Sequence, residues 1–341
     1  MKSKTKNLLT KEQITKLVKV NFGDSCDIST ITELKGGMFN SAYLIERIKE
    51  KDQIVLKVSA ATGTPLLTYE KDTMLTEVEV YQLIMEKTTI PVPKILAFDF
   101  SKKELNSNYF FMTAMEGEPM NKVSSKIGKE NKEKIKKELA GYFAQLHQIK
   151  GNYYGYFTTD PKHQYTTWKA AFLHMFYMIL TDGKTHNIKL PYHKYQKVLQ
   201  ENAGYLEEIK MSSLVDYDLW PGNIFVKKAG EEYVIEGILD FERSFWGDAF
   251  ADFPPAFLMA DNIKKENIFL ESYLKANADR KEFTEADEIR FYLYRMYIYT
   301  IMAVESYRYG FLYGKIQFYF SKSTAVKCMK KLELIQKGAK A

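Results

Sequence analysis

The sequence predicts an α+β protein with two lobes, a small one built on an antiparallel sheet and a larger one that is mostly helical. Apolar and polar residues alternate through residues 28–58 between turn residues, a pattern typical of antiparallel strands. After residue 116 the apolar residues recur at helical spacing, and strand-type patterning returns only around 214–240. We therefore expect the small lobe to span residues 1–116 and the helical lobe to span residues 117–341.

The elements of the small lobe are predicted in chain order from local patterns. The basic N-terminal segment is expected to form a helix capped by Thr10. Three strands are expected within 28–58, followed by a helix over 72–87, where apolar residues recur three or four positions apart. Two further strands are expected within 90–100 and 108–117, on either side of a polar break.

Helical patterns predict the framework of the second lobe. They cover residues 127–149, 165–182, 190–210, 262–278 and 284–309 or beyond. A hairpin is expected in the middle of this lobe, with strands at 223–226 and 233–240 and a polar turn between them. With the turn centred near Ala229 and Gly230, antiparallel register would set Asp240 opposite Leu219.

Composition excludes several classes of protein. The chain has 341 residues, of which 45% are hydrophobic and 27% charged, so it can bury a large core and is not a disordered chain. Cys26 and Cys328 are its two cysteines, too few for a disulfide framework or a cysteine metal site. A reducing, cytoplasmic location is therefore expected. The longest apolar run, at 170–180, is about half the length that a membrane span needs, so no span is expected.

The net charge of +6 does not by itself indicate nucleic-acid binding. Its lysines are scattered, and the lysine-rich stretch 122–149 has the spacing of a helix with one solvated face. No motif that combines aromatic and basic residues accompanies it, so no nucleic-acid partner is expected. A nucleic-acid binder driven by charge remains a competing interpretation, and salt-dependent binding would distinguish it.

The segment VDYDLWPGNIFV, residues 215–226, carries the chemistry. The predicted hairpin brings Asp218, Asn223 and Asp240 together at its open end. Oxygen ligands of this kind suit Mg²⁺, which takes one or two protein carboxylates or carbonyls and completes its shell with phosphate oxygens and water. Asn223 and Asp240 would then hold the metal, while Asp218 is free to meet a substrate hydroxyl, as in a phosphoryl-transfer site.

These residues resemble the catalytic core of the aminoglycoside phosphotransferase/choline kinase-like family, the small-molecule branch of the protein-kinase-like fold. YDLWPGNIFV followed by GILDFERSFWGDAFADF carries the resemblance, which covers residues 28–255. It implies that Asp218 is the catalytic base, that Asn223 and Asp240 bind Mg²⁺, and that a Gly-Asp-x-x-x-Asp segment braces the loop. That segment consists here of Gly247, Asp248 and Asp252.

One position departs from the family pattern. Asp216 and Tyr217 stand where the family usually has His-Gly, and an ionised Asp216 offers only hydrogen-bond acceptors in place of a donor. This departure motivates a second hypothesis, a non-catalytic, pseudokinase-like module that binds ATP without transferring phosphate.

The small lobe is expected to supply the nucleotide site. Gly36, Gly37 and Ser41 lie between the first two strands, where a loop can bring its backbone close to phosphates, although Gly-Gly is more often an ordinary turn. Lys57 interrupts an apolar strand, and an ammonium held by a glutamate can bind the α and β phosphates. Both Glu77 and Glu79 are available on the following helix; the resemblance favours Glu77.

The resemblance also implies an adenine-binding hinge in YFFMTAMEGEPM. Met112 would be the gatekeeper, and the Thr113 carbonyl and Met115 amide would bind the adenine. The expected cofactors are thus ATP and Mg²⁺. Because only a short segment follows Asp240 and no Ala-Pro-Glu motif is present, the expected acceptor is a small hydroxylated molecule rather than a protein. A cationic amine on the acceptor is one option, and the oligomeric state is left open.

The sequence suggests roles for three further side chains, His147, Glu242 and Glu305. His147 lies on the apolar side of a helix and is expected to be a hydrogen-bonded core histidine. Glu242 could touch a second metal ion, but a structural role is favoured. Glu305 lies in an aromatic helix, 289–314, that could line the acceptor cleft, where its carboxylate would pair with an ammonium group.

Overall fold

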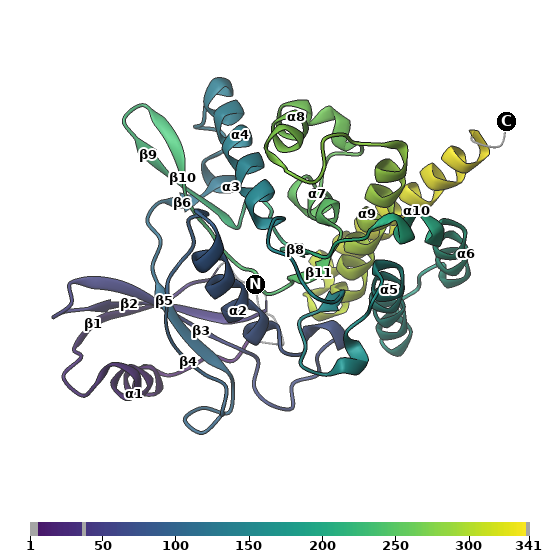
Figure 1. Ribbon diagram of the computed structural model, residues 1–341. Coiled ribbons are helices and arrows are strands. Elements are labelled where there is room, and N and C mark those ends of the chain that lie inside the picture. The colour runs from purple at the N-terminus through teal and green to yellow at the C-terminus, as the bar shows by residue number, and fades with distance from the viewer. Residues whose placement is uncertain (1–5, 36–38, 339–341) are drawn as a thin grey trace.

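The computed structural model describes residues 6–35 and 39–338 and confirms the predicted α+β class (Figure 1). An antiparallel sheet with two helices forms the N-terminal lobe, and helices surround two small three-stranded sheets in the remainder. Within the described residues, no helix has both the length and the hydropathy needed to cross a bilayer.

A five-stranded antiparallel sheet forms the small lobe, in the order β1-β2-β3-β5-β4. Its strands are β1 (Ile28–Glu33), β2 (Ser41–Arg47), β3 (Asp52–Val58), β4 (Ile95–Asp99) and β5 (Tyr109–Thr113). The two helices are α1 (Lys11–Phe22), capped by Thr10 as predicted, and α2 (Thr73–Lys87). All five predicted strands and both helices are therefore confirmed.

The alternation along β3 decides which side chains face each helix. Ile54, Leu56 and Val58 pack with α1, whereas Val55 joins the core that includes the apolar side of α2. Because neighbouring side chains on a strand point to opposite faces, Lys57 lies on the same face as Val55. The strand thus directs a single ammonium group toward α2.

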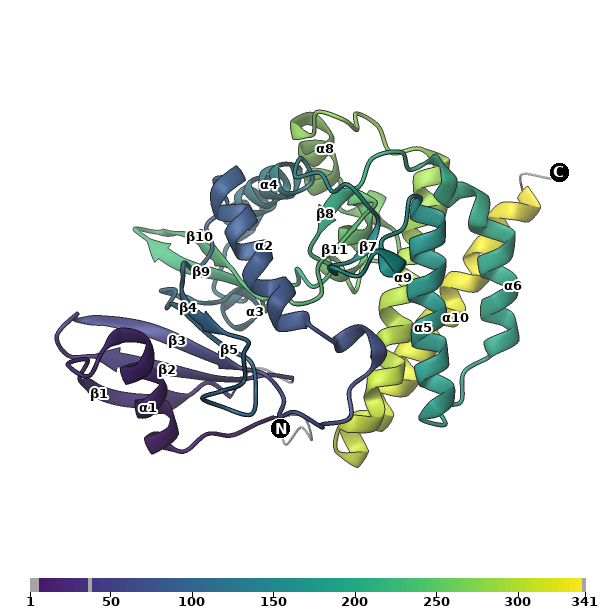
Figure 2. The same cartoon turned by 60° about the horizontal axis from the view of Figure 1, so that its bottom comes forward.

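The helical part contains α3 (Met120–Val123), α4 (Lys129–Leu146), α5 (Trp168–Thr185), α6 (Tyr192–Asn202), α7 (Phe253–Ala256), α8 (Asn267–Ala276), α9 (Glu285–Glu305) and α10 (Phe311–Gly338). Helix α9 is buried along almost its whole length, with α5 and α10 packed against it (Figure 2). This explains its tyrosine-rich sequence, because the hydroxyl groups find partners inside the core. Trp168, for example, donates its indole N–H to Tyr294.

Two small three-stranded sheets connect these helices to the site. Strands β9 (Ile224–Ala229) and β10 (Glu232–Ile238) form the predicted hairpin, to which β6 (Glu118–Pro119) adds a third strand. Strands β7 (Gly155–Tyr156), β11 (Phe245–Gly247) and β8 (Ser213–Val215) form another group.

The predicted register of the hairpin was wrong. The turn lies at Gly230–Glu231 rather than at Ala229–Gly230, and an irregularity between Ile235 and Gly237 shifts the pairing again. The Leu239 N–H consequently donates to the carbonyl of Asn223, so that Asp240 follows directly after this pair instead of facing Leu219. Turn chemistry and a bulge together set a register that period-2 patterning alone does not specify.

Gly117 provides a test of how tightly β6 is docked on the hairpin. Its φ is +85°, and a Cβ atom there would lie 2.4 Å from the backbone oxygen of Val226. We expect Gly117→Ala to lower the free energy of unfolding by about 1–3 kcal/mol, because a strained backbone is combined with a clash that no rotamer relieves. Denaturant titration measures the loss. Gly128→Ala is the control, since a Cβ atom there meets nothing within 4 Å.

Candidate active site

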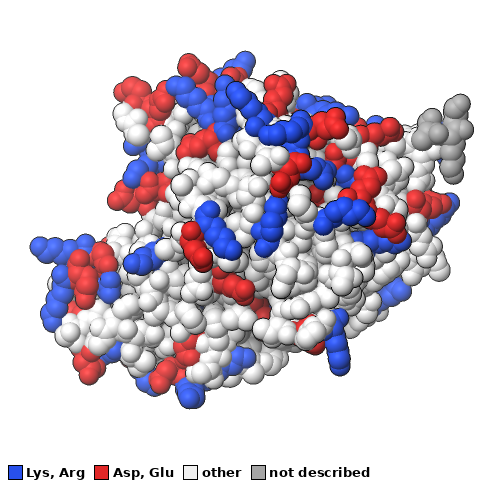
Figure 3. All heavy atoms as spheres, in the orientation of Figure 1, with Lys and Arg blue, Asp and Glu red and all other residues white. Residues whose placement is uncertain are grey.

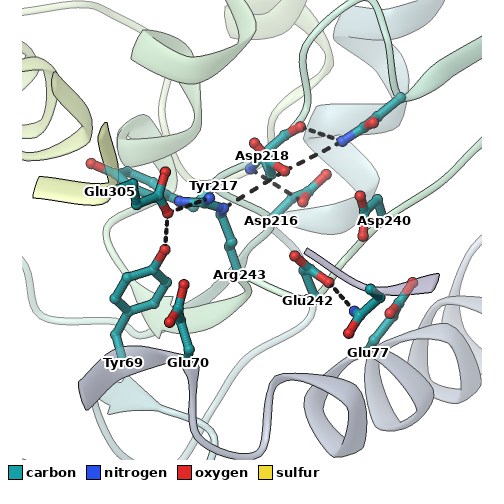
Figure 4. A network of polar contacts seen from close by, with 12 residues as sticks. Tyr69, Glu70, Glu77, Asp216, Tyr217, Asp218, Asp240, Glu242, Arg243 and Glu305 are labelled. Carbon is teal, nitrogen blue, oxygen red and sulfur yellow. Dashed lines mark hydrogen bonds and ion pairs between the residues drawn. The ribbon is translucent and has the colours of Figure 1, made fainter. Parts of the chain in front are cut away.

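The loop between β8 and β9 carries Asp218 and is closed by its own hydrogen bonds. The Asn223 side-chain Nδ2 donates to the backbone carbonyl of Asp218 over 2.9 Å, and the Trp220 N–H donates to the same carbonyl at 2.9 Å. Tyr217 has a φ of +63°, an unusual backbone angle for a residue with a large side chain. The loop thus holds Asp218 and Asn223 side by side, and Figure 4 shows Asp218 beside Asp216 and Tyr217.

Asp252 braces this loop from the helical lobe. Its carboxylate accepts the N–H groups of Asp216, at 3.1 Å, and Tyr217, at 2.6 Å. It also lies 2.9 Å from Nε2 of His147, whose Nδ1 is 2.7 Å from the Tyr273 hydroxyl. His147 is therefore the hydrogen-bonded core histidine that the sequence predicts. All of these groups are buried, and together they fix the backbone just before Asp218.

The structure places Lys57 within reach of three carboxylates. Its Nζ is 2.7 Å from Glu77, 2.6 Å from Asp240 and 3.3 Å from Glu242. Glu77 is buried and turned toward the sheet, whereas Glu79 is exposed, so the structure selects the glutamate favoured by the resemblance. Residues that lie 183 positions apart in the chain thus meet at one ammonium group.

Helix α2 positions Asp240 as well as Lys57. The Asp240 N–H donates to the hydroxyl of Tyr81 over 3.0 Å, and Tyr81 lies one helical turn after Glu77. Asp240 has a φ of +72°, outside the regions that ordinary residues prefer. The Tyr81 contact and the hairpin hold it in this conformation, which directs its carboxylate toward Lys57.

Burial shifts the pKa values of this cluster. It raises the pKa of Glu77 to about 8 in spite of the opposing effect of Lys57, and burial followed by Asp240 raises that of Glu242 to about 6. Burial disfavours the charged form of Lys57, but the three carboxylates outweigh it and raise its pKa well above the usual value. Burial also raises the pKa of Asp218 to about 8, with Asp240 and Glu242 adding to the shift and Arg243 opposing it.

These shifts predict how the stability of the metal-free protein depends on pH. Between about pH 4, where carboxyl groups of the unfolded chain ionise, and about pH 8, the folded protein holds a proton on Asp218 that the unfolded chain releases. The free energy of unfolding should therefore fall as the pH rises through this window, by about 1.4 kcal/mol per pH unit from this group. Thermal unfolding in a chelator, followed across this range, measures the slope.

Asp218→Asn is the matched variant for this measurement. It removes one of the titrating carboxyl groups at nearly constant shape, so the melting temperature should fall less steeply with pH than in the unmodified chain. Equal slopes for the two proteins would contradict the raised pKa of Asp218.

The oxygen atoms near Asp240 suit a hard divalent cation. Oxygen atoms of Glu77, Asp240 and Glu242 lie within 4.8 Å of one another. The side-chain nitrogen of Asn223 is used in its contact with Asp218, which leaves the Asn223 carbonyl oxygen as a neutral ligand. Since Glu77 is almost fully buried against Lys57, the residues that fit Mg²⁺ are Asp240 and Asn223, with Glu242 as a neighbour.

Only part of the predicted phosphate-binding loop lies within the described residues. Gly36 and Gly37 lie outside the described residues. Ser41 is the first residue of β2 and is buried, and its hydroxyl has no hydrogen-bond partner within the described part of the chain. Asn40, which was not singled out from the sequence, donates to Glu242 over 2.7 Å. This contact joins the residue just before β2 to the carboxylate cluster.

The predicted hinge lies at the end of β5. Met112 is buried between Val55 of β3 and Ile95 of β4. The Thr113 N–H and hydroxyl oxygen are paired with the backbone of Lys94. The side chain of Met115 reaches the hairpin, where its Cε would lie 2.3 Å from a Cβ atom on Gly237.

Arg243 is the main site residue that the sequence did not reveal. Its guanidinium lies 2.8 Å from Glu305 and 3.8 Å from Asp218, and it covers the ring of Tyr69. Figure 4 shows Arg243 between the two carboxylates. Glu305, assigned provisionally to an acceptor ammonium, accepts hydrogen bonds from Arg243 and Tyr69 instead. An arginine among buried aromatic residues, three positions after Asp240, is the signal that could have drawn attention to it.

A second group of contacts joins the lobes beside Arg243. The short 3-10 helix η1 (Thr68–Glu70) follows the loop that leaves β3. Its Thr68 binds Asp182 of α5, and its Glu70 forms a buried ion pair with Arg308, just after α9. Because α2 begins only three residues after η1, the helix that carries Glu77 is fixed to the helical lobe at its N-terminal end.

The model of the phosphotransferase enzyme family matches residues 30–291, and no curated protein matches the sequence. Several solved structures of aminoglycoside phosphotransferases resemble the chain. A thermostable mutant of APH(4)-Ia bound to AMP-PNP and hygromycin B has a TM-score of 0.63 at 14% identity and covers 93% of this chain and 98% of its own.

Two further structures agree with this comparison. The ternary complex of APH(2'')-IIa with streptomycin and ATP has a TM-score of 0.63 at 15% identity and covers 95% of this chain and 99% of its own. An aminoglycoside phosphotransferase described as putative, from Ralstonia eutropha, has a TM-score of 0.64 at 12% identity and covers 95% and 98%. Identities this low establish a shared fold. Because the family model spans most of the sequence, the chain belongs to the phosphotransferase enzyme family.

Proposed function

We propose that the protein transfers the γ-phosphoryl group of ATP to a hydroxyl group of a small molecule. One observation carries this proposal: Lys57 bridges Glu77 of the small lobe and Asp240 of the helical lobe, beside Asp218. Phosphoryl transfer depends on positioning and on cations that offset phosphate charge, and this arrangement provides both. The junction of the two lobes, near residues 116 and 117, would then border the nucleotide.

Each residue has a role in this scheme. Asp218 accepts the proton of the acceptor hydroxyl, and Arg243 holds its carboxylate in place. Lys57, fixed by Glu77, binds phosphate oxygens. Asp240 and Asn223 would hold Mg²⁺, which would supply positive charge to offset that of the phosphates. Gly36, Gly37 and Ser41 would approach the phosphates, and Met112, Thr113 and Met115 would bind the adenine.

The acceptor class is supported by the relatives and by charge. The APH(4)-Ia and APH(2'')-IIa structures contain hygromycin B and streptomycin. Around Asp218 the ionisable neighbours are mostly carboxylates, which favours an acceptor that carries positive charge. We therefore place aminoglycoside-like antibiotics first, followed by amino-alcohol or sugar metabolites. The two cysteines are free thiols, which suits a cytoplasmic location.

The competing function is a nucleotide-binding module without transferase activity. Asp216 motivates it, because one of its carboxylate oxygens is buried without a partner in the described part of the chain. Against it, Asp252 holds the loop through the Asp216 and Tyr217 amides, so loop order does not require the usual histidine. ATP consumption across aminoglycosides, macrolides, choline-like amines and sugars tests the proposal. Turnover with one class, absent in Asp218→Ala, supports transfer; ATP–Mg binding without turnover across that panel favours the module.

The two glutamates of α2 provide a matched pair of variants. Glu77→Gln removes a charge that holds Lys57, so we expect the KM for ATP to rise and kcat/KM to fall by about 10-fold to 100-fold. Glu79→Gln alters an exposed side chain two positions away and should leave both values within about twofold. Steady-state kinetics with varied ATP measures both. Equal losses in the two variants would contradict the assignment of Glu77.

A further inference from the structure

The first half of α10 exposes large apolar side chains to solvent. Leu312 is 73% exposed, Ile316 is 60% exposed and Tyr319 is 65% exposed, with Tyr313 and Phe320 also accessible. At about 100° per residue these five side chains occupy an arc of about 120° on the helix. We call them the α10 stripe. They form one continuous face rather than the scattered apolar residues that are normal on a protein surface.

On the opposite side of the same turns, where α10 faces the core, the residues are small or polar. A Cβ atom on Gly314 would lie 2.6 Å from the carbonyl oxygen of Ser306, so α10 approaches its neighbour closely there. Gln317 is buried and donates to the carbonyl of Met302 on α9, and Ser321 is fully buried. The usual amphipathic pattern, with apolar residues inside, is therefore inverted in this part of the helix.

This inversion ends abruptly along the chain. From Ala325 to Leu332 the buried positions of α10 are apolar again, including Cys328 and Met329. Over the same length the exposed face carries Lys327, Lys330 and Lys331. Leu334 is the exposed apolar side chain of this second half, so the continuous apolar surface is confined to the first half of the helix.

The exposed area is large enough for a specific protein interface. With about 200 Å² for a fully exposed large side chain, the α10 stripe and the adjoining Phe311 expose roughly 700 Å². Largest apolar patches on monomers are about 300–600 Å², and each partner of a standard interface buries about 800 Å². We propose that a second copy of this chain covers the stripe, so that the protein is a symmetric dimer joined through α10.

Charge indicates how the two helices are arranged. In a parallel pair, the lysines that follow the stripe in each copy would lie beside those of the other copy and repel them. In an antiparallel pair that crosses near Ile316, the two apolar halves overlap and the lysine halves point in opposite directions. A twofold axis generates this arrangement, because an isologous interface places the same surface on both partners. Leu312 of one copy then lies opposite Phe320 of the other.

Within residues 6–35 and 39–338, no segment covers the stripe. A second α10 stripe provides an apolar area of equal size, so that each copy would bury the exposed side chains of the other.

The molar mass of the full-length chain in solution tests the proposal. Light scattering after size exclusion, at about 10 µM, should give twice 39.7 kDa. Ile316→Lys and Tyr319→Lys each place a charge in the middle of the apolar contact and should weaken dimerisation by at least about 100-fold, leaving the monomer. Met259→Lys, at a residue 80% exposed outside the stripe, is the matched control and should remain dimeric.

Thermal unfolding and cross-linking complete the experiment. A monomeric variant that still unfolds cooperatively at a high melting temperature is folded. Its failure to dimerise is then not caused by loss of the fold. Separately tagged Leu312→Cys and Phe320→Cys chains, mixed and oxidised, should form the mixed disulfide in preference to either symmetric one. The native Cys26 and Cys328 are buried and should not react. Preference for the symmetric disulfides would overturn the antiparallel arrangement.

Three results would overturn the dimer itself. The first is a 39.7 kDa species that persists up to about 100 µM. The second is a dimer that Ile316→Lys leaves as stable as before. The third is a monomer that floats with vesicles of phosphatidylcholine and phosphatidylserine unless Ile316→Lys is present, which would assign the stripe to a membrane surface. The outcome does not depend on the phosphotransfer proposal, since none of the residues tested lies in the candidate active site.

Discussion

Asp218→Ala is expected to lower kcat by about 10²–10⁴ while leaving the binding of ATP nearly unchanged. The reason is that Asp218 is the group placed to accept the proton of the acceptor hydroxyl, and general-base catalysis typically contributes a factor of this size. Nucleotide contacts would be retained, because Lys57, Glu77 and Asp240 are held by one another. Coupled measurement of ADP release, together with calorimetric titration of ATP, separates the two effects.

The control for this prediction is Asp218→Asn. It keeps the shape of the side chain and its place beside Asn223 and Arg243 but removes the base, so its kcat should fall nearly as far as that of the alanine variant. A variant that retains full turnover would remove Asp218 from the mechanism. Equal loss of ATP binding in both variants would instead assign Asp218 to the nucleotide site.

Asp252→Ala is expected to lower the free energy of unfolding by about 3–5 kcal/mol. The substitution leaves the buried N–H groups of Asp216 and Tyr217, and the ring of His147, without their acceptor. Each unsatisfied buried group costs about 1–3 kcal/mol. Because the same bonds fix the backbone before Asp218, activity should fall as well. Chemical denaturation measures the stability, and turnover well below the melting temperature measures the loss of positioning.

Two control variants show whether the loss of stability is specific to the Asp252 carboxylate. Asp252→Asn keeps one acceptor oxygen, so its loss of stability should be smaller than that of the alanine variant. Asp261→Ala removes an exposed carboxylate that pairs with Lys265, and its stability should change by about 0.5 kcal/mol or less. A fully stable Asp252→Ala protein would show that the loop is held by other contacts.

The distribution of surface charge bears on the competing interpretation, a nucleic-acid binder driven by charge. On the face shown in Figure 3, lysine and arginine side chains are interspersed with aspartate and glutamate, without a large region of one sign. A steep dependence of binding on salt is expected from a continuous basic surface. The net charge of +6 is therefore distributed, on this face, in the way that the scattered lysines of the sequence predicted.

Local patterns predicted the secondary structure of this chain well. The Thr10 cap, the five strands of the small lobe and α2 are all present, because capping and apolar periodicity act over a few residues. The catalytic hairpin was also predicted, but its register was not. Its pairing depends on the Gly230–Glu231 turn and the irregularity before Gly237, which the surrounding contacts select.

The sequence by itself determined the fold class and the residue types at the site, since DYDLWPGN and the aspartate at the end of the next strand are contiguous signals. Only the tertiary structure decided which partners those residues meet. Glu77 rather than Glu79 binds Lys57, Arg243 lies between Asp218 and Glu305, and the face of α10 opposite its core contacts is apolar. The physical reason is that these pairings depend on how helices and strands pack across the molecule. A local pattern specifies the face of an element but not the residue that will lie against it.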